Sequence, residues 1–323
     1  MHYRASFTIT GSQTSSFHFT TDCFSAALDR HGENFQERPI LFFQRTSTFA
    51  ISLLGVPGDE KVWNSLSGEY HWTGVAPTLA FVGILFQLAS QHGFDADRSS
   101  TALIDVGANM GQEVVVAGLY NYKATTFEIL PRSAKTVKFN LAANCVSLDL
   151  TTIVNSGAGE QSGSLMMDFS GFSAAKVAGS ASDAATDKAH IWSLDDYFFE
   201  QDSQELASRP LLLKLDCEGC EPGALKGSQK LMRDYPPHFI LLEYRSEYPG
   251  YTEEVAKLML DLHYTRAFVV TNTDSFLVGK DQVSAKETFF KSDLRTKSWS
   301  VDDGPCLCDI LFVHNDAIDI GLF

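Results

Sequence analysis

Five polar side chains stand at the ends of short apolar segments of this sequence: Asp105, Glu128, Asn155, Asp216 and Glu243. In an open parallel sheet, ligands bind beyond the carboxyl ends of the strands, near the point where the strand order reverses. Carboxylates gathered there can hold a cationic group, accept hydrogen bonds from hydroxyls, or take up a proton during a reaction. If the five segments are parallel strands, the five side chains converge on one site.

The first segment leads into a glycine-rich turn, residues 105–111, followed by a helical pattern of apolar residues. Gly107 and Gly111 allow a sharp turn and a close approach of the backbone to a ligand. The dinucleotide fingerprint Gly-x-Gly-x-x-Gly is broken, because Asn109 takes the place of its second glycine and the third is missing. Asp105 would repel a diphosphate and attract an amino group. The turn therefore favours a zwitterionic amino-acid ligand.

Glu128 lies 23 residues after Asp105. An acid at this spacing, after the second strand of a nucleotide-binding unit, typically accepts hydrogen bonds from ribose hydroxyls. We therefore expect Glu128 to contact a ribose rather than to be a solvated acid at a strand end.

The elements that must position these side chains alternate regularly between strand and helix from residue 101 onward, which predicts a parallel sheet in a layered α/β sandwich. The predicted strands are 101–106, 124–129, 150–155, 211–216, 238–244, 266–271 and 306–313. The predicted helices are 111–121, 133–144, 223–234 and 252–262, with another at 79–91 before the first strand.

Five segments, in order, resemble the motifs of FkbM-family methyltransferases, which use S-adenosylmethionine. These segments are Ile104 to Gly111, Phe127 to Pro131, Asn155 to Glu160 with Gly163, Ser193 to Phe198, and Leu213 to Glu221. Five ordered motifs are far more specific than one glycine loop. The departures from the family pattern are exchanges of small residues at Ile129, Gly157, Cys217 and Cys220.

The resemblance implies a Rossmann-like, mostly parallel sheet of seven strands, as in class I methyltransferases, with the last strand antiparallel. It also implies that S-adenosylmethionine is the cofactor. The residues that it assigns to cofactor binding are Asp105, Gly107, Ala108, Asn109 and Gly111 around the methionine part, Glu128 at the ribose, and Asn155 and Gly157 on the adenine side. The implied activity is methyl transfer, and we expect an oxygen nucleophile, a hydroxyl of a small molecule or sugar, as the acceptor.

A hydroxyl acceptor loses a proton, and a base within hydrogen-bond reach would help. Asp216 and Glu243 are the candidates by position, although Asp216 could instead orient the amino group of the cofactor. Glu218 and Glu221 add carboxylates that a divalent cation could bind. No ligand spacing demands a metal, and both acids also suit the start of the helix from 223, so we expect none.

Composition limits the partners. Asp and Glu number 40 against 25 Lys and Arg, giving a net charge of −15, which repels a phosphate backbone and argues against nucleic acid. The six cysteines lack the paired spacing of a secreted scaffold, which favours a reducing compartment such as the cytoplasm. Cys217-x-x-Cys220 and Cys306-x-Cys308 could form a zinc site, but we expect these four cysteines to be small apolar residues buried in the core instead.

No charged residue occurs between Glu69 and Asp95. The apolar core of this stretch falls short of the roughly 20 residues that a membrane span needs, so we expect the buried helix at 79–91. Residues 1–75 show no motif and are interpreted as an extension that packs on or covers a methyltransferase domain at 76–323. Residues 170–188 suggest a surface loop, and the long connection 272–303 is expected to frame the acceptor pocket with the extension.

Two alternatives stay open. An NAD(P)-dependent oxidoreductase could use a related sheet, although Asn109 argues against it. A protein of the same fold could also bind S-adenosylmethionine without turnover. Binding of NAD(P) would identify the first, and binding of S-adenosylmethionine without formation of S-adenosylhomocysteine the second.

Overall fold

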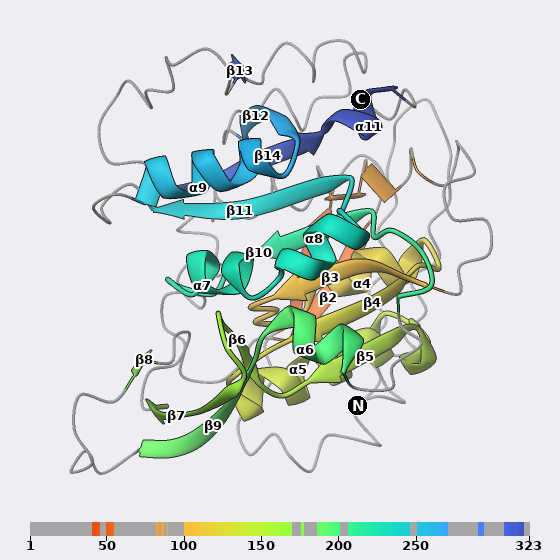
Figure 1. The fold of residues 1–323 in the computed structure, drawn as a ribbon. Helices are drawn as coiled ribbons and strands as arrows, with labels where there is room; N and C mark the ends of the chain where they lie inside the picture. The colour runs from red at the N-terminus through yellow and green to blue at the C-terminus, as the bar shows by residue number, and fades with distance from the viewer. Residues whose placement is uncertain are drawn as a thin grey trace, which may run out of the picture.

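The computed structural model describes residues 41–45, 50–54, 82–83, 85–86, 89, 100–169, 176–177, 186–200, 206–245, 251–270, 290–293 and 307–319. Its centre is a sheet of eight strands in the order β13-β12-β14-β11-β10-β3-β4-β5 (Figure 1). The strands are β3 (Thr101–Val106), β4 (Lys123–Phe127), β5 (Thr151–Val154), β10 (Leu212–Leu215), β11 (Phe239–Arg245), β12 (Tyr264–Val270), β13 (Phe290–Asp293) and β14 (Leu307–His314).

The predicted seven-stranded arrangement is confirmed, with the short β13 added at one edge. β5, β4, β3, β10 and β11 are parallel neighbours, and β14 runs antiparallel to both β11 and β12. The chain adds β4 and β5 on one side of β3 and then returns to its other side with β10. The strand order therefore reverses between β3 and β10, which is where such sheets bind ligands.

Helices cover both faces of the sheet. α4 (Gln112–Leu119), α5 (Pro131–Ala143), α11 (Asn315–Asp319) and the buried helical positions within 82–89 share one apolar core with alternate strand residues such as Leu103 and Leu212. α6 (Leu194–Phe199), α7 (Glu221–Lys226), α8 (Gln229–Asp234) and α9 (Tyr251–Asp261) share the other core, with Ile104 and Leu213. Strands buried on both faces explain the continuous apolar runs of the sequence.

The helix predicted over 223–234 is two helices, α7 and α8, because the chain turns between them at Gly227. A Cβ atom on Gly227 would lie 2.1 Å from the carbonyl oxygen of Gly159, so the neighbouring loop approaches too closely for a side chain. The Gly227 carbonyl accepts a hydrogen bond from the amide of Asp195, over 2.9 Å. These contacts fix the turn on the first residues of α6.

A second sheet of four strands was not predicted. Its order is β6-β9-β7-β8, formed by β6 (Gly157–Ala158), β7 (Gly163–Asp168), β8 (Lys176–Val177) and β9 (Thr186–Trp192), and it projects beyond β5 and α6 at the lower left of Figure 1. β8 and the start of β9 fall within 170–188, so the surface-loop prediction is wrong there; residues 170–175 and 178–185 lie outside the described part. Four of the six β7 residues are exposed, and the strand has no apolar alternation that could have revealed it.

Near the N-terminus, β1 (Leu41–Arg45) and β2 (Ala50–Leu54) form an antiparallel pair, and β2 contacts α5 and α4. The interpretation of residues 1–75 as an extension and the division at residue 75 stay predictions. Of the connection at 272–303, only β13 is described. Among the described helices, none is both long and apolar enough to cross a membrane.

Candidate functional site

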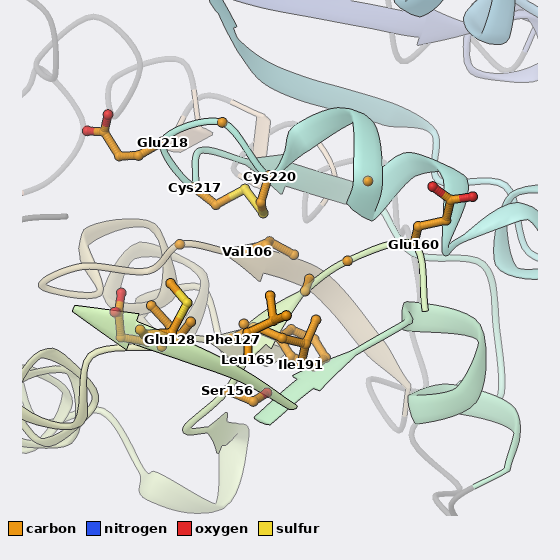
Figure 2. A pocket seen from close by; sticks show the side chains of 18 of the residues that line it. Val106, Phe127, Glu128, Ser156, Glu160, Leu165, Ile191, Cys217, Glu218 and Cys220 are labelled. Carbon is orange, nitrogen blue, oxygen red and sulfur yellow. A yellow bond between two sulfur atoms is a disulfide. The ribbon is translucent and has the colours of Figure 1, made fainter. Parts of the chain in front are cut away.

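A cavity of about 810 Å³ opens at the carboxyl ends of β3, β4 and β10 (Figure 2). Its wall is built from the glycine-rich turn after β3, the residues that follow β4, the segment 156–165 with Ile191, and the loop 216–223 after β10. Four segments far apart in sequence thus meet at the reversal of strand order. This volume lies within the range of small-molecule and cofactor sites.

Gly107 joins the ends of β3 and β10. Its φ of 87° is left-handed, and a Cβ atom there would lie 1.8 Å from the backbone carbonyl oxygen of Asp216. The amide of Asp216 in turn donates to the carbonyl of Val106, over 3.0 Å. Because the clash is with backbone, no side chain is compatible with this contact.

The rest of the turn is also in special conformations. Asn109 has a φ of 50° and Gly111 a φ of 76°, and a Cβ atom on Gly111 would lie 2.8 Å from Cγ1 of Val137 in α5. Gly111 and the buried Ala108 shape the turn but do not line the cavity, whereas Gly107 and Asn109 line it.

Glu128 lines the cavity and ties the turn to the segment after β4. One carboxylate oxygen accepts from the amide of Asn109 over 2.7 Å and the other from the amide of Leu130 over 2.8 Å. Burial raises the pKa of Glu128 to about 7, although these two hydrogen bonds act in the opposite direction. Each oxygen keeps further acceptor capacity toward a ligand hydroxyl.

Asn155 supports the same segment from outside. Its amide nitrogen donates to the carbonyls of Glu128 over 2.8 Å and of Ile129 over 3.2 Å. Asn155 itself is exposed and does not line the cavity, but the following Ser156 and Gly157 do. The side chain predicted to bind the cofactor therefore holds the loop that reaches the cavity.

Behind the cavity lies Lys214, a buried cation surrounded by carboxylates. Its Nζ atom lies 3.0 Å from Oδ2 of Asp216, 3.8 Å from Oε1 of Glu113 and 3.9 Å from Oδ1 of Asp105. Burial alone would lower the pKa of Lys214, but the three carboxylates together raise it well above its usual value. Lys214 is the one charged residue of an otherwise apolar strand, a signal in the sequence that could have marked it as part of the site.

Asp105 does not reach the cavity. It is completely buried in β3, neither of its carboxylate oxygens has a hydrogen-bond partner, and burial raises its pKa to about 8 against the effect of Lys214. Asp216, in contrast, lines the cavity with a side chain that is 37% exposed. The residue with direct access to a ligand is therefore Asp216, connected to Asp105 through Lys214.

Glu243 is not among the cavity-lining residues either. It lies in β11 opposite Asp309 of β14. The five predicted strand ends thus meet in part: Glu128 and Asp216 line the cavity, whereas Asn155, Asp105 and Glu243 are not among the lining residues.

The cysteines differ from expectation. Cys217 and Cys220 form a disulfide, are half-buried and line the cavity, so the prediction of buried reduced thiols is wrong for this pair. Cys145 is also disulfide-bonded. The cysteine argument for a reducing compartment therefore fails. No group of three or more His, Cys, Asp or Glu side chains in the described ranges is arranged to hold a metal ion.

Comparison with protein families matches residues 105–265 to the methyltransferase FkbM domain. No curated protein matches the chain. Among solved structures, a methyltransferase FkbM from Methylobacillus flagellatus KT is similar at 15% identity and a TM-score of 0.39, over 66% of this chain and 44% of that chain, less than half of its length. The plantazolicin methyltransferase BamL, in complex with a triazolic desmethylPZN analog and SAH, is similar at 11% identity and a TM-score of 0.37, over 92% of this chain and all of that chain. The fold is defined by the strand order above rather than by these scores.

Proposed function

We propose that the chain, whose residues 105–265 match the methyltransferase FkbM domain, transfers a methyl group from S-adenosylmethionine to a hydroxyl of a small molecule or sugar. The proposal rests on the cavity at the reversal of strand order. There the backbone of Gly107 lies so close to the backbone of Asp216 that residue 107 cannot carry a side chain. A side chain at residue 107 would separate the two walls that a ligand must touch together.

The residues around the cavity fit this cofactor in chemistry. Asp216 can accept hydrogen bonds from an α-amino group, and its Lys214 partner keeps the carboxylate in place. Glu128 can accept from ribose hydroxyls. Ile129, Leu130, Gly157 and Ala158 belong to the cavity lining and offer apolar surface for the adenine ring. Asp105, Ala108, Gly111 and Asn155 act indirectly, by holding these residues in position.

When bound, the cofactor supplies a methyl group on a positively charged sulfur. The cavity residues position the acceptor hydroxyl in line with this group and exclude water, which is the main contribution of a protein to such a displacement. The oxygen gains the methyl carbon as the carbon–sulfur bond breaks, and the hydroxyl proton leaves to a base. We assign the base to Asp216, or to water if Asp216 holds the amino group; Glu243, at the corresponding position of the neighbouring strand β11, is the second candidate although it is not among the lining residues.

The proposal is tested by titrating the chain with S-adenosylmethionine, S-adenosylhomocysteine and NAD(P) in parallel by calorimetry. We expect binding of the two sulfur compounds and none of NAD(P). Asp216→Asn should weaken binding at least about tenfold, whereas Asp261→Asn, an exposed acid of α9, should not. Hydroxylated small molecules and sugars are then screened for the formation of S-adenosylhomocysteine. Binding of NAD(P) alone would overturn the proposal, and binding without turnover of any acceptor would favour a non-catalytic protein.

A further inference from the structure

The disulfide between Cys217 and Cys220 forms part of the cavity wall. Figure 2 shows it under the start of α7, across the cavity from Phe127, Leu165 and Ile191. It closes a loop that begins one residue after Asp216 and ends one residue before Glu221. A disulfide across so few residues removes little conformational freedom from the unfolded chain, so stabilisation of the fold is a weak explanation for it.

Inside this loop the backbone is held in an unfavourable conformation. Glu218 has a φ of 60° and Gly219 a φ of 111°, and the left-handed region costs free energy for a residue with a side chain. The buried Glu221 holds the loop from within, because its Oε1 accepts from the amides of Cys217 over 2.9 Å and of Gly219 over 3.2 Å. Opening the disulfide would remove the covalent part of this restraint.

The loop is directly connected to the residues that we assign to the cofactor. Cys217 follows Asp216, whose carbonyl oxygen lies against Gly107. A change in the backbone after Asp216 therefore changes the contact between the two turns. Both cysteines are half-buried and line the cavity, so the pair lies at the site rather than in the core. Two cysteines separated by two residues are the usual arrangement of a thiol–disulfide exchange centre.

We propose that Cys217 and Cys220 are a reversible redox site, and that the disulfide form holds the loop in the conformation that binds the cofactor. A dithiol reductant, small or carried by a protein, gives two electrons and two protons to the disulfide; the sulfur–sulfur bond breaks, two thiols form, and the reductant becomes a disulfide itself. The effect on ligand binding rests on the proposed function, because it assumes that the cavity binds S-adenosylmethionine and its product.

The test measures the affinity for S-adenosylhomocysteine by calorimetry in three preparations of the chain: as oxidised, after reduction with dithiothreitol, and after reoxidation with oxidised glutathione. Alkylation followed by mass spectrometry reports the state of Cys217 and Cys220 in each preparation. We expect the dissociation constant to rise at least about tenfold on reduction and to return on reoxidation.

The Cys217→Ser/Cys220→Ser variant separates this pair from other disulfides, such as that of Cys145. It should bind as weakly as the reduced chain and should not respond to dithiothreitol. If the variant fails to fold by circular dichroism, the reduced wild-type chain alkylated at both cysteines replaces it. Any of three results would overturn the inference but not the proposed function. They are equal affinity in the oxidised and reduced chains, a response to dithiothreitol that persists in the variant, and a disulfide that dithiothreitol does not reduce in the folded chain. Absence of binding in every state would contradict the proposed function and the inference together.

Discussion

At the scale of single residues, the site depends on one buried cation, Lys214, which is shared by three carboxylates. Removing one partner of a buried ion pair leaves an uncompensated buried charge, which costs far more than losing an exposed pair. Lys214 is 4% exposed and its partner Glu113 is 3% exposed, so water cannot replace the lost ammonium.

We therefore expect Lys214→Met to lower the free energy of unfolding by about 3–5 kcal/mol and to weaken cofactor binding, because Asp216 loses its partner. Urea unfolding measures the first effect and calorimetry the second. Lys226→Met is the matched control, since its ion pair with Glu254 is exposed, and it should change stability little. Similar losses in the two variants would contradict the importance of the buried cluster.

Asp105 should make the stability of the chain depend on pH. Burial raises its pKa from 3.8 to about 8, so the folded state keeps a proton that the unfolded state releases. Its contribution to stability is complete below pH 3.8 and is lost as the pH rises to about 8, at up to about 1.4 kcal/mol per pH unit. Asp105→Asn should therefore flatten the fall in free energy of unfolding between pH 5 and pH 8, measured by urea unfolding. Parallel curves for the variant and the wild type would show that Asp105 does not titrate in this range.

The candidate site could be predicted from sequence in part. Glycine spacing indicated the turn at residues 107–111, and the acid after the second strand indicated Glu128, because both depend on local backbone geometry. The roles of Asp105 and Asn155 could not be derived in this way, since which side of a strand end faces the ligand depends on packing between distant segments. The disulfide was missed because Cys217 and Cys220 replace apolar residues of the family motif, which favoured a buried pair of thiols.

At the scale of elements, α6 and α8 are joined by one carboxylate. Asp195 accepts from the amides of Lys230 and Leu231, each over 2.8 Å, and so satisfies two free amides at the start of α8. This contact gives a physical reason for an acid at this position of the Leu194-Asp195-Asp196 motif.

Asp195→Ala should lower the free energy of unfolding by about 1–2 kcal/mol, the usual cost of losing a helix cap. Asp187→Ala, at an exposed position of β9, is the control and should have little effect. Thermal unfolding followed by circular dichroism makes the comparison. A loss no larger than that of the control would mean that α8 is held by packing alone.

The main sheet was predictable because its central strands β3, β10 and β11 are mostly apolar and buried, and because strands alternate with helices along the chain. The small sheet was not, because β7 is mostly exposed and is stabilised by pairing with β9 rather than by a buried face. The break between α7 and α8 also depends on a distant contact, the approach of Gly159 to Gly227. Sequence periodicity reports burial, and these features are defined by contacts between segments.

At the scale of the whole molecule, the net charge of −15 should distinguish the two sulfur ligands. S-adenosylmethionine carries one more positive charge than S-adenosylhomocysteine, so the field of the chain attracts it more strongly. Raising the salt concentration from 10 to 150 mM should weaken its binding by about threefold more than that of S-adenosylhomocysteine. Calorimetry at the two concentrations measures this difference, and equal salt dependence would show that the cavity is screened from the surface charge.

The position of β14 has a consequence for biosynthesis. The chain passes from β11 through α9 to β12 before it reaches β14, yet β14 lies between β11 and β12 and pairs with both. The edges of β11 and β12 that face each other therefore have no partner strand until residues 307–314 have left the ribosome. Unpaired strand edges bind other strands readily. We therefore expect the nascent chain to expose these edges to chaperones until β14 emerges, and a translational pause before that point to lengthen the exposure.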